Sequence, residues 1–413
     1  MDASGHIELD DAVRMVLDAL STLPGETFEL DSALGRVLAQ DIVAERPLPP
    51  FDGSAMDGFA VRAADVAGAR DAEPVVLRLV GESRAGRPAQ ETLGDGQAIA
   101  ISTGAIIPAG ADAVVRVERT RRDDGRVQVL EEVAPGEQVR RAGEDMQAGT
   151  TVLQRGATLG PAQLGVLASL GHAHVRCASA PRVSLLVTGD ELLAAGERAR
   201  PGAIRDSNSH SVAALARCAG AEVLASEVVG DDERATRAAI AAAAHDADMV
   251  VICGGMSVGA HDHVRASLRA LGATQAFWGL ALRPGHPTWF GTLNGRPVFG
   301  LPGNPVSAMV TFVLLAGPAL RAMQGAPQGR ARSTARLDGG YDKPAGRAHA
   351  LRCRLSERDD GRHAAPTGPQ GSHVLSSMLA ADALALIPSQ TTRVAPAEHV
   401  EIEPLAPWMG GWA

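Results

Sequence analysis

The chain has few aromatic residues and almost no lysine. Only 3% of its 413 residues are aromatic, so a buried core has to be formed mainly by alanine, valine and leucine. One of the 39 basic residues is a lysine, Lys343, and all the others are arginines. An arginine found where another protein has lysine therefore carries little meaning in this chain.

Paired cysteines, basic runs and long apolar stretches are also missing. The four cysteines are scattered without a C-x-x-C pair, which argues against a disulfide framework or a zinc site. The net charge of −9 and the lack of a basic run argue against nucleic acid or an anionic membrane as partner. The most apolar stretch, residues 306–320, falls short of the roughly 20 residues that span a bilayer, and we expect a buried core helix there. The acidic, polar N-terminus lacks a signal-peptide pattern, so we expect a cytoplasmic protein.

Four blocks with different patterns follow one another along the chain. Apolar residues at helical spacing predict a helix over residues 10–23, and short alternating runs predict an all-β module after the proline-rich segment 47–50. Strands then alternate with helices over residues 181–324, which predicts a mostly parallel sheet covered on both faces. Short strands return at the C-terminus.

The sequence therefore predicts a multi-domain α/β protein. Its parts are a doubly wound, mostly parallel α/β domain, an inserted all-β domain, an elongated mixed α/β domain and a small C-terminal β-barrel. The predicted boundaries are 1–47 with 138–176 for the elongated domain, 48–137 for the inserted domain, 177–328 for the α/β domain and 329–413 for the barrel.

Three glycine-rich loops follow strands of the predicted α/β domain, at residues 188–191, 254–259 and 301–305. Open α/β sheets bind ligands beyond the carboxyl ends of their strands, and glycines let the backbone approach an anion. Nearby carboxylates suggest Mg²⁺ bridging to phosphates. One such loop is more often only a tight turn, but three at one edge favour a phosphate site.

Two further segments are unusual for structure alone. Residues 54–62, SAMDGFAVR, place an acid between methionine and glycine at the start of a strand, and residues 368–377, GPQGSHVLSS, combine glycine, serine and histidine in one loop. Each of them alone is more often a capped turn than a site.

The chain resembles the molybdopterin molybdenumtransferase family, whose eukaryotic relatives include the C-terminal domain of gephyrin. The matching segments run in family order over residues 47–377: PPFDGSAMDGFAVR, ISTGAIIPAGADAVVRVE, VRRAGEDMQAGT, TGDEL, GAIRDSNS, GGMSVGAHD, FGLPGNPVSA and GPQGSHVLSS. Segments this long and numerous make a chance similarity very improbable.

The resemblance implies a homodimer whose active site lies between the α/β, molybdopterin-binding-type domain of one subunit and the inserted domain of the other. It implies adenylylated molybdopterin and molybdate as substrates, with Mg²⁺ assisting cleavage of the phosphoanhydride and release of AMP. Contact with the molybdopterin adenylyltransferase is a further implied partnership.

Carried over residue by residue, the resemblance implies functional residues in every quoted segment but VRRAGEDMQAGT and GAIRDSNS. The catalytic positions are Asp57, Thr103, Glu191, Asp231 and Asp262, with Asp262 and Glu191 as metal ligands. The substrate-binding positions are Gly254, Gly255, Ser257, Gly259, Arg283, His286, Pro302, Gly303, Asn304, Ser307, Arg352 and Ser372.

The chain departs from the family where the family usually reads F-W-K-x-x-x-K-P-G-K-P. This sequence has FWGLALRPGHP, in which Arg283 keeps a positive charge, Gly279 removes one, and His286 replaces an ammonium with an imidazole that is mostly neutral at pH 7. The oxyanion pocket is expected to be weaker in positive charge.

Two other functions stay open on the sequence. A cofactor- or nucleotide-binding scaffold that has lost insertion chemistry would fit the missing lysines. A nucleotide pyrophosphatase would fit the α/β module, but the inserted β domain and the C-terminal barrel argue against it.

Overall fold

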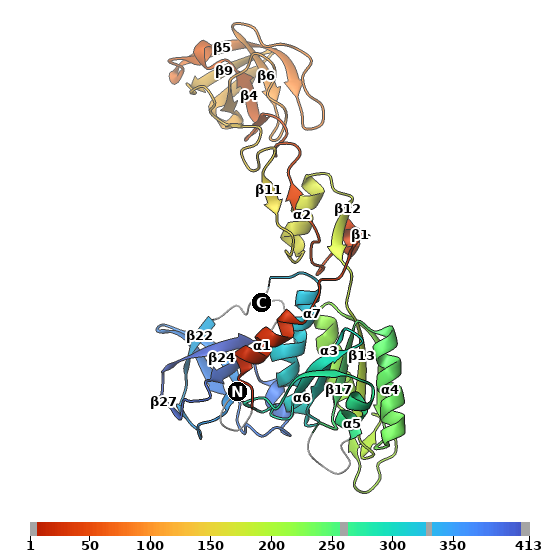
Figure 1. Ribbon diagram of the computed structural model, residues 1–413. Coiled ribbons are helices and arrows are strands. Elements are labelled where there is room, and N and C mark those ends of the chain that lie inside the picture. The colour runs from red at the N-terminus through yellow and green to blue at the C-terminus, as the bar shows by residue number, and fades with distance from the viewer. Residues whose placement is uncertain (1–5, 257–262, 328–332, 406–413) are drawn as a thin grey trace.

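The protein is elongated, with β-structure at one end and an α/β unit beside a barrel at the other (Figure 1). The structure, a computed structural model, describes residues 6–256, 263–327 and 333–405. A narrow middle part, called the stalk here, joins the two ends and consists of β1, β2, β11, α2 and β12. This architecture confirms the predicted fold class, whereas the domain boundaries stay a prediction.

The stalk is formed by two segments far apart in the sequence. β1 pairs antiparallel with β12, β2 pairs with β11, and a small core around Leu38, Leu159 and Leu167 joins them to α2. The bounds are Gly25–Glu29 for β1, Ile42–Val43 for β2, Thr151–Leu153 for β11, Pro161–Ser169 for α2 and His174–Ala178 for β12.

The first helix, α1 (Leu9–Asp18), ends five residues before the predicted helix does. Its buried residues Leu9, Ala12 and Val16 belong to the core of the α/β unit, so α1 packs there and not in the stalk. A short 3₁₀ turn, η1 (Leu30–Ser32), follows β1.

The inserted sheet has six strands in the order β7-β4-β6-β5-β9-β8. Gly58 opens β4, and a Cβ at this position would lie 2.0 Å from the Val115 carbonyl oxygen, so only glycine fits between the strands. The bounds are Gly58–Val61 for β4, Arg70–Ser83 for β5, Gln97–Ile101 for β6, Ala113–Arg116 for β7, Thr120–Asp123 for β8 and Arg126–Glu131 for β9. β3 (Gly53–Ser54) pairs with β10 (Val139–Arg140) where the chain enters and leaves this sheet.

The α/β unit contains a six-stranded sheet in the order β16-β13-β17-β21-β20-β18, in which only β20 runs antiparallel to its neighbours. Its strands are β13 (Arg182–Thr188), β16 (Glu222–Val229), β17 (Met249–Cys253), β18 (Thr274–Trp278), β20 (Trp289–Leu293) and β21 (Arg296–Leu301). Its helices are α3 (Asn208–Cys218), α4 (Glu233–Asp246), α5 (His263–Ala270), α6 (Pro305–Thr311), the π-helical η4 (Phe312–Ala316) and α7 (Gly317–Met323). A two-stranded pair, β14 (Leu192–Leu193) with β15 (Ile204–Arg205), lies beyond β13.

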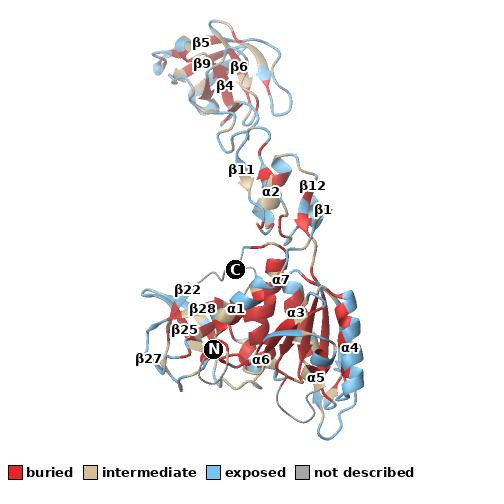
Figure 2. Ribbon diagram, in the orientation of Figure 1, coloured by how far each residue is buried: buried red, intermediate tan, exposed pale blue. Residues whose placement is uncertain are grey.

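The continuous helical run from α6 to α7 is the one described segment long and apolar enough to cross a membrane by length and composition. It spans Pro305–Met323, and 89% of its most apolar 18-residue stretch is buried inside the protein. Figure 2 shows this run in red against the equally buried sheet. The prediction of a buried core helix is confirmed.

The C-terminal strands close into a small barrel. β24 pairs with β25, β25 with β22, β22 with β28, β28 with β26, and β26 pairs back with β24. β19 (Leu282–Arg283) of the α/β unit adds to β24 and so joins the two units. The bounds are Ser333–Leu337 for β22, Ala348–Arg358 for β24, Gly361–Pro366 for β25, Ala383–Ile387 for β26 and His399–Pro404 for β28, with α8 (Ser376–Leu379) between β25 and β26 and the pair β23 (Tyr341–Asp342) with β27 (Arg393–Val394) alongside.

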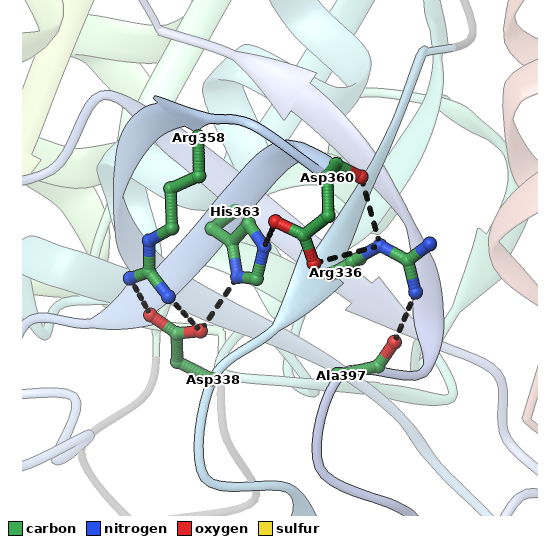
Figure 3. Close-up of polar contacts among 6 residues, drawn as sticks. All are labelled: Arg336, Asp338, Arg358, Asp360, His363 and Ala397. Carbon is green, nitrogen blue, oxygen red and sulfur yellow. Dashed lines mark hydrogen bonds and ion pairs between the residues drawn. The ribbon is translucent and has the colours of Figure 1, made fainter.

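A charged cluster on the barrel is organised around His363 (Figure 3). Its Nδ1 lies 2.8 Å from Asp338 Oδ1 and its Nε2 lies 2.9 Å from Asp360 Oδ1. Arg358 pairs with Asp338, and Arg336 pairs with Asp360. The hydrogen bonds to Asp338 and then to Asp360 raise the pKa of His363, because both carboxylates favour the protonated ring.

Candidate functional site

The three glycine-rich loops predicted at one sheet edge do meet there. A cavity of about 220 Å³ lies at the carboxyl ends of β13, β17 and β21 and is lined by residues of all three loops. Of the predicted site residues, it brings together Glu191, Asp231, Gly254, Gly255, Pro302 and Gly303. Among the described residues, the charged groups that line the cavity are two carboxylates, and no arginine, lysine or histidine is among them.

Glycine is required in two of these loops by close approach. Gly254 has a φ of +94°, and a Cβ there would lie 2.8 Å from both the carbonyl and the hydroxyl oxygen of Thr188. Gly189 has a φ of +147°, and the carboxylate of Glu191 lies over the position that a Cβ would take. The loops after β13 and β17 are therefore in direct contact at the cavity.

The acids at the cavity rim are held by their own backbone neighbours. Asp190 Oδ1 accepts a hydrogen bond from the Asp231 N–H at 3.0 Å, and Asp231 Oδ2 accepts a longer one, 3.4 Å, from the Asp190 N–H. These reciprocal bonds join the ends of β13 and β16. Glu191 makes no such bond and is exposed beside them.

Asn208 is a residue of this site that the sequence reasoning missed. It is buried at the start of α3, and its Nδ2 donates to the Gly303 carbonyl oxygen at 2.8 Å. Its Oδ1 is buried without a hydrogen-bond partner among the described residues. The available signal was the segment GAIRDSNS, which contains Asn208 and was one of the segments that carry the resemblance.

A second group of predicted residues lies where the barrel meets α6. Arg352 is 1% exposed, donates from Nε to Ser377 Oγ at 3.1 Å and from Nη2 to the Gly371 carbonyl at 3.2 Å, and pairs with no carboxylate in the described chain. Burial lowers its pKa. The Ser372 carbonyl accepts a hydrogen bond from the Val306 N–H at 3.2 Å, which places the loop of Ser372 beside buried Ser307. Asn304, exposed, begins α6 without a side-chain cap.

Arg283 and His286, two of the three positions at which the chain departs from the family, lie next to this group. Arg283 is exposed on β19, opposite His349 of β24. The pKa of His349 falls to about 4, first through burial and then through the positive charges of Lys343, Arg283 and Arg347. His286 is half-buried, its Nδ1 lies 3.2 Å from the Leu280 carbonyl, and its ring contacts His6 edge-on, with the ring centroids 4.3 Å apart.

Gly279, the other departure, has a φ of +90°. This is a conformation that residues with a side chain rarely adopt. A Cβ at this position would also lie 3.0 Å from the His6 ring.

Asp57 and Thr103 form a third group, which lies in the inserted unit at the far end of the molecule (Figure 1). Asp57 Oδ1 accepts hydrogen bonds from the Thr103 N–H at 2.7 Å and from its hydroxyl at 3.0 Å, and both residues are exposed. A cavity of about 490 Å³ nearby is lined in part by Gly104, Glu144 and Asp145. These last two acids belong to the segment VRRAGEDMQAGT, from which no site residue was predicted. Within one chain this group does not meet the other two.

Three predicted residues, Ser257, Gly259 and Asp262, lie outside the described residues. In the described ranges, no group of three or more histidine, cysteine or acidic residues is arranged to hold a metal ion. The described acids of the α/β cavity are Glu191 and Asp231.

Glycine-rich loops at a sheet edge, a cavity beside them and a buried arginine define a multi-domain α/β protein with a candidate ligand site at the carboxyl ends of its parallel strands. Three family models match the chain in order: the MoeA N-terminal region (domain I and II) over residues 7–171, a probable molybdopterin binding domain over 184–322 and the MoeA C-terminal region (domain IV) over 334–405.

Relatives of known name cover nearly the whole length. The chain is 38% identical to molybdopterin molybdenumtransferase 2 of Mycobacterium tuberculosis, over 94% of this chain and 97% of that protein. It is 36% identical to molybdopterin molybdenumtransferase of Haemophilus influenzae, over 98% of this chain and all of the other. The crystal structure of the molybdopterin biosynthesis MoeA protein of Pyrococcus horikoshii matches with a TM-score of 0.83 and 32% identity, over 97% of this chain and all of that one. The chain belongs to the MoeA family of molybdopterin molybdenumtransferases.

Proposed function

We propose that this protein inserts molybdate into adenylylated molybdopterin and releases AMP and active molybdenum cofactor. The observation that carries the proposal is the position of two oppositely charged regions on either side of residues 301–307. The acidic cavity lies on one side, and buried Arg352 lies beside the Ser372 loop on the other. The substrate's phosphoanhydride and the molybdate oxyanion need these two different environments.

Mg²⁺ is the ion that we assign to the acidic cavity. Its described lining contains two carboxylates and no cationic side chain, and Mg²⁺ is usually held by one or two carboxylates together with substrate phosphates. The residues present therefore fit the ion. Glu191 and Asp262 are the proposed ligands, with Asp231 beside them. Bound there, Mg²⁺ would neutralise negative charge on the phosphates.

The residues of the chain itself bind and orient the substrates. Backbone N–H groups of the loops containing Gly254 and Gly255 approach the phosphates, because no side chain at these positions keeps them at a distance. Arg352, whose two described donor bonds hold its guanidinium in place, supplies the permanent positive charge for molybdate. Arg283, His286, Ser307 and Ser372 complete the oxyanion side.

Asp57 and Thr103 complete the site from a second subunit. Within one chain they lie at the opposite end of the molecule, so a homodimer in which the inserted unit of one subunit faces the α/β cavity of the other accounts for their role. The same open cavity would receive the substrate from the molybdopterin adenylyltransferase. The free cysteines fit a cytoplasmic protein.

The test is AMP release from adenylylated molybdopterin, measured with and without molybdate and with and without Mg²⁺. We expect release that requires both. Molybdate binding without AMP release would instead support the cofactor-binding scaffold, and molybdate-independent release would support a pyrophosphatase.

A further inference from the structure

A polar cavity of about 230 Å³ lies where the stalk meets the end of α7. The two parts touch through backbone there: the Leu23 N–H donates to the Met323 carbonyl at 2.7 Å. A Cβ on Gly156 would lie 2.7 Å from the Gly325 carbonyl oxygen. The cavity is therefore enclosed by the stalk on one side and by the turn after α7 on the other.

In the part of the chain that the structure describes, the charged residues that line this cavity are two arginines, Arg155 and Arg176, and no acidic residue lines it. Neither guanidinium forms an ion pair with a residue in the described ranges. Asp41 contacts Arg155 only through the backbone, since its Oδ1 accepts a hydrogen bond from the Arg155 N–H at 2.7 Å. Elsewhere in this chain of net charge −9, arginines beside acids pair with them, as Arg182 does with Asp248.

Two neighbours hold the cavity in shape. A Cβ on Gly25 would lie 2.9 Å from Arg176 Nε, so the side chain of Arg176 lies directly against the backbone of β1. Gln324, which is buried, donates from Nε2 to the Ala219 carbonyl at 2.8 Å and to the Leu320 carbonyl at 3.0 Å. Arg176 thus lies against β1 at the edge of the cavity, and Gln324 holds the end of α7 beside it.

We propose that this cavity binds a small tetrahedral oxyanion between Arg155 and Arg176. Guanidinium groups bind such anions by paired, charge-assisted hydrogen bonds. The volume is below the roughly 300–1,000 Å³ of sites for drug-sized molecules and leaves room for one oxyanion with a few waters of about 30 Å³ each. An anion bound there holds stalk residues against the end of α7. This site is separate from the acidic cavity and from Arg352.

The experiment is calorimetric titration of the full-length protein with inorganic phosphate, at constant ionic strength, with sulfate as a second probe. The test variant carries Arg155→Gln and Arg176→Gln together. The control is Arg78→Gln, because Arg78 is also exposed and forms no ion pair with a described residue but lies in the inserted sheet. A second variant, Arg155→Lys with Arg176→Lys, keeps the charge.

We expect the glutamine variant to lose one phosphate equivalent or to bind it at least about tenfold more weakly, as two charge-assisted donors are removed. The Arg78→Gln variant should bind like the wild type, and the lysine variant should keep part of the affinity. Phosphate binding that is the same in the glutamine variant and the wild type would overturn the proposal. Circular dichroism of the glutamine variant tests whether its fold is intact. If it is not, the lysine variant decides, because loss of the phosphate equivalent from a folded lysine variant, which keeps both positive charges, would contradict the assignment.

Discussion

The inserted unit and the α/β unit carry the two halves of the proposed site in very different ways. In the inserted unit, the exposed Asp57 carboxylate accepts two hydrogen bonds from Thr103, which follows the neighbouring strand β6, and the pair depends on this one residue-to-residue contact. In the α/β unit, the cavity depends on three loops, which meet at Gly254, where a Cβ would contact Thr188 of the first loop, and at Gly303, where a Cβ would contact the Gly254 backbone. Substitutions in the inserted unit should therefore act on single groups, whereas substitutions in the α/β unit should also move neighbouring loops.

The largest effect is expected for Glu191→Gln in the α/β cavity. Glu191 is exposed and its carboxylate accepts no hydrogen bond from a described residue, so replacing it should leave the melting temperature unchanged. AMP release should fall by about 100-fold or more, the range seen when one group that stabilises transition-state charge is removed. Glu222→Gln is the matched control, because Glu222 is also exposed but lies at the amino-terminal end of β16, opposite to the end that reaches the cavity. Normal turnover in the Glu191→Gln enzyme would remove this acid from the site.

A smaller effect is expected for Asn208→Leu, which tests whether the loops act together. The substitution removes the hydrogen bond to the Gly303 carbonyl and also removes an unsatisfied buried oxygen, so stability should change by less than about 1 kcal/mol. The freed loop should raise KM about tenfold, since loss of one positioning hydrogen bond is worth about 1.4 kcal/mol at most here. The control is Ser211→Ala, which removes a different buried oxygen of α3 that has no hydrogen-bond partner among the described residues and should leave KM unchanged. Equal KM values in Asn208→Leu and the wild type would contradict the coupling.

The barrel should respond to pH through His363, without an effect on chemistry. Its pKa is raised in the folded state, so its stabilising contribution is complete below the ordinary value of about 6.5 and is lost as pH rises through the raised pKa. The pKa values of Asp338 and Asp360 are lowered, first by their hydrogen bonds to His363. Their contribution is therefore lost as pH falls below about 4.

His363→Gln should thus lower the melting temperature most near pH 5 to 6 and progressively less in alkaline solution. The control is His399→Gln, an exposed histidine on the same barrel. A difference between wild type and His363→Gln that does not vary with pH would show that the histidine acts only by packing.

The smallest effect is expected at His286, on the oxyanion side. The ring is oriented by the Leu280 carbonyl and by contact with His6, and the adjacent Pro287 lines the acidic cavity. His286→Lys adds a permanent charge and should tighten molybdate binding a few-fold, as expected for one partly exposed charge. His286→Gln, which stays neutral, should not. Unchanged affinity in the lysine variant would show that this position does not face the anion.

The sequence predicted the fold class and the meeting of the three loops, because strand–helix alternation places the carboxyl ends of parallel strands at one edge. It could not predict that α1 packs on the α/β unit, since an amphipathic helix of this length fits either neighbour. The hydrogen bond from Asn208 to the Gly303 carbonyl could not be predicted either, because it joins residues 95 positions apart in the sequence. Likewise, Asp360 lies only three residues before His363, but Asp338 reaches the same ring because β22 pairs with β25, which the sequence did not predict.

The most direct test of the account is complementation between the two halves. Asp57→Ala and Glu191→Ala are purified as inactive proteins, mixed, dissociated and re-formed, and molybdate-dependent AMP release is measured. If one site is assembled from two subunits, mixed dimers contain one site with both acids intact, and activity should return to a substantial fraction of the wild-type value. Re-formed mixed dimers that stay as inactive as the separate variants would contradict the account.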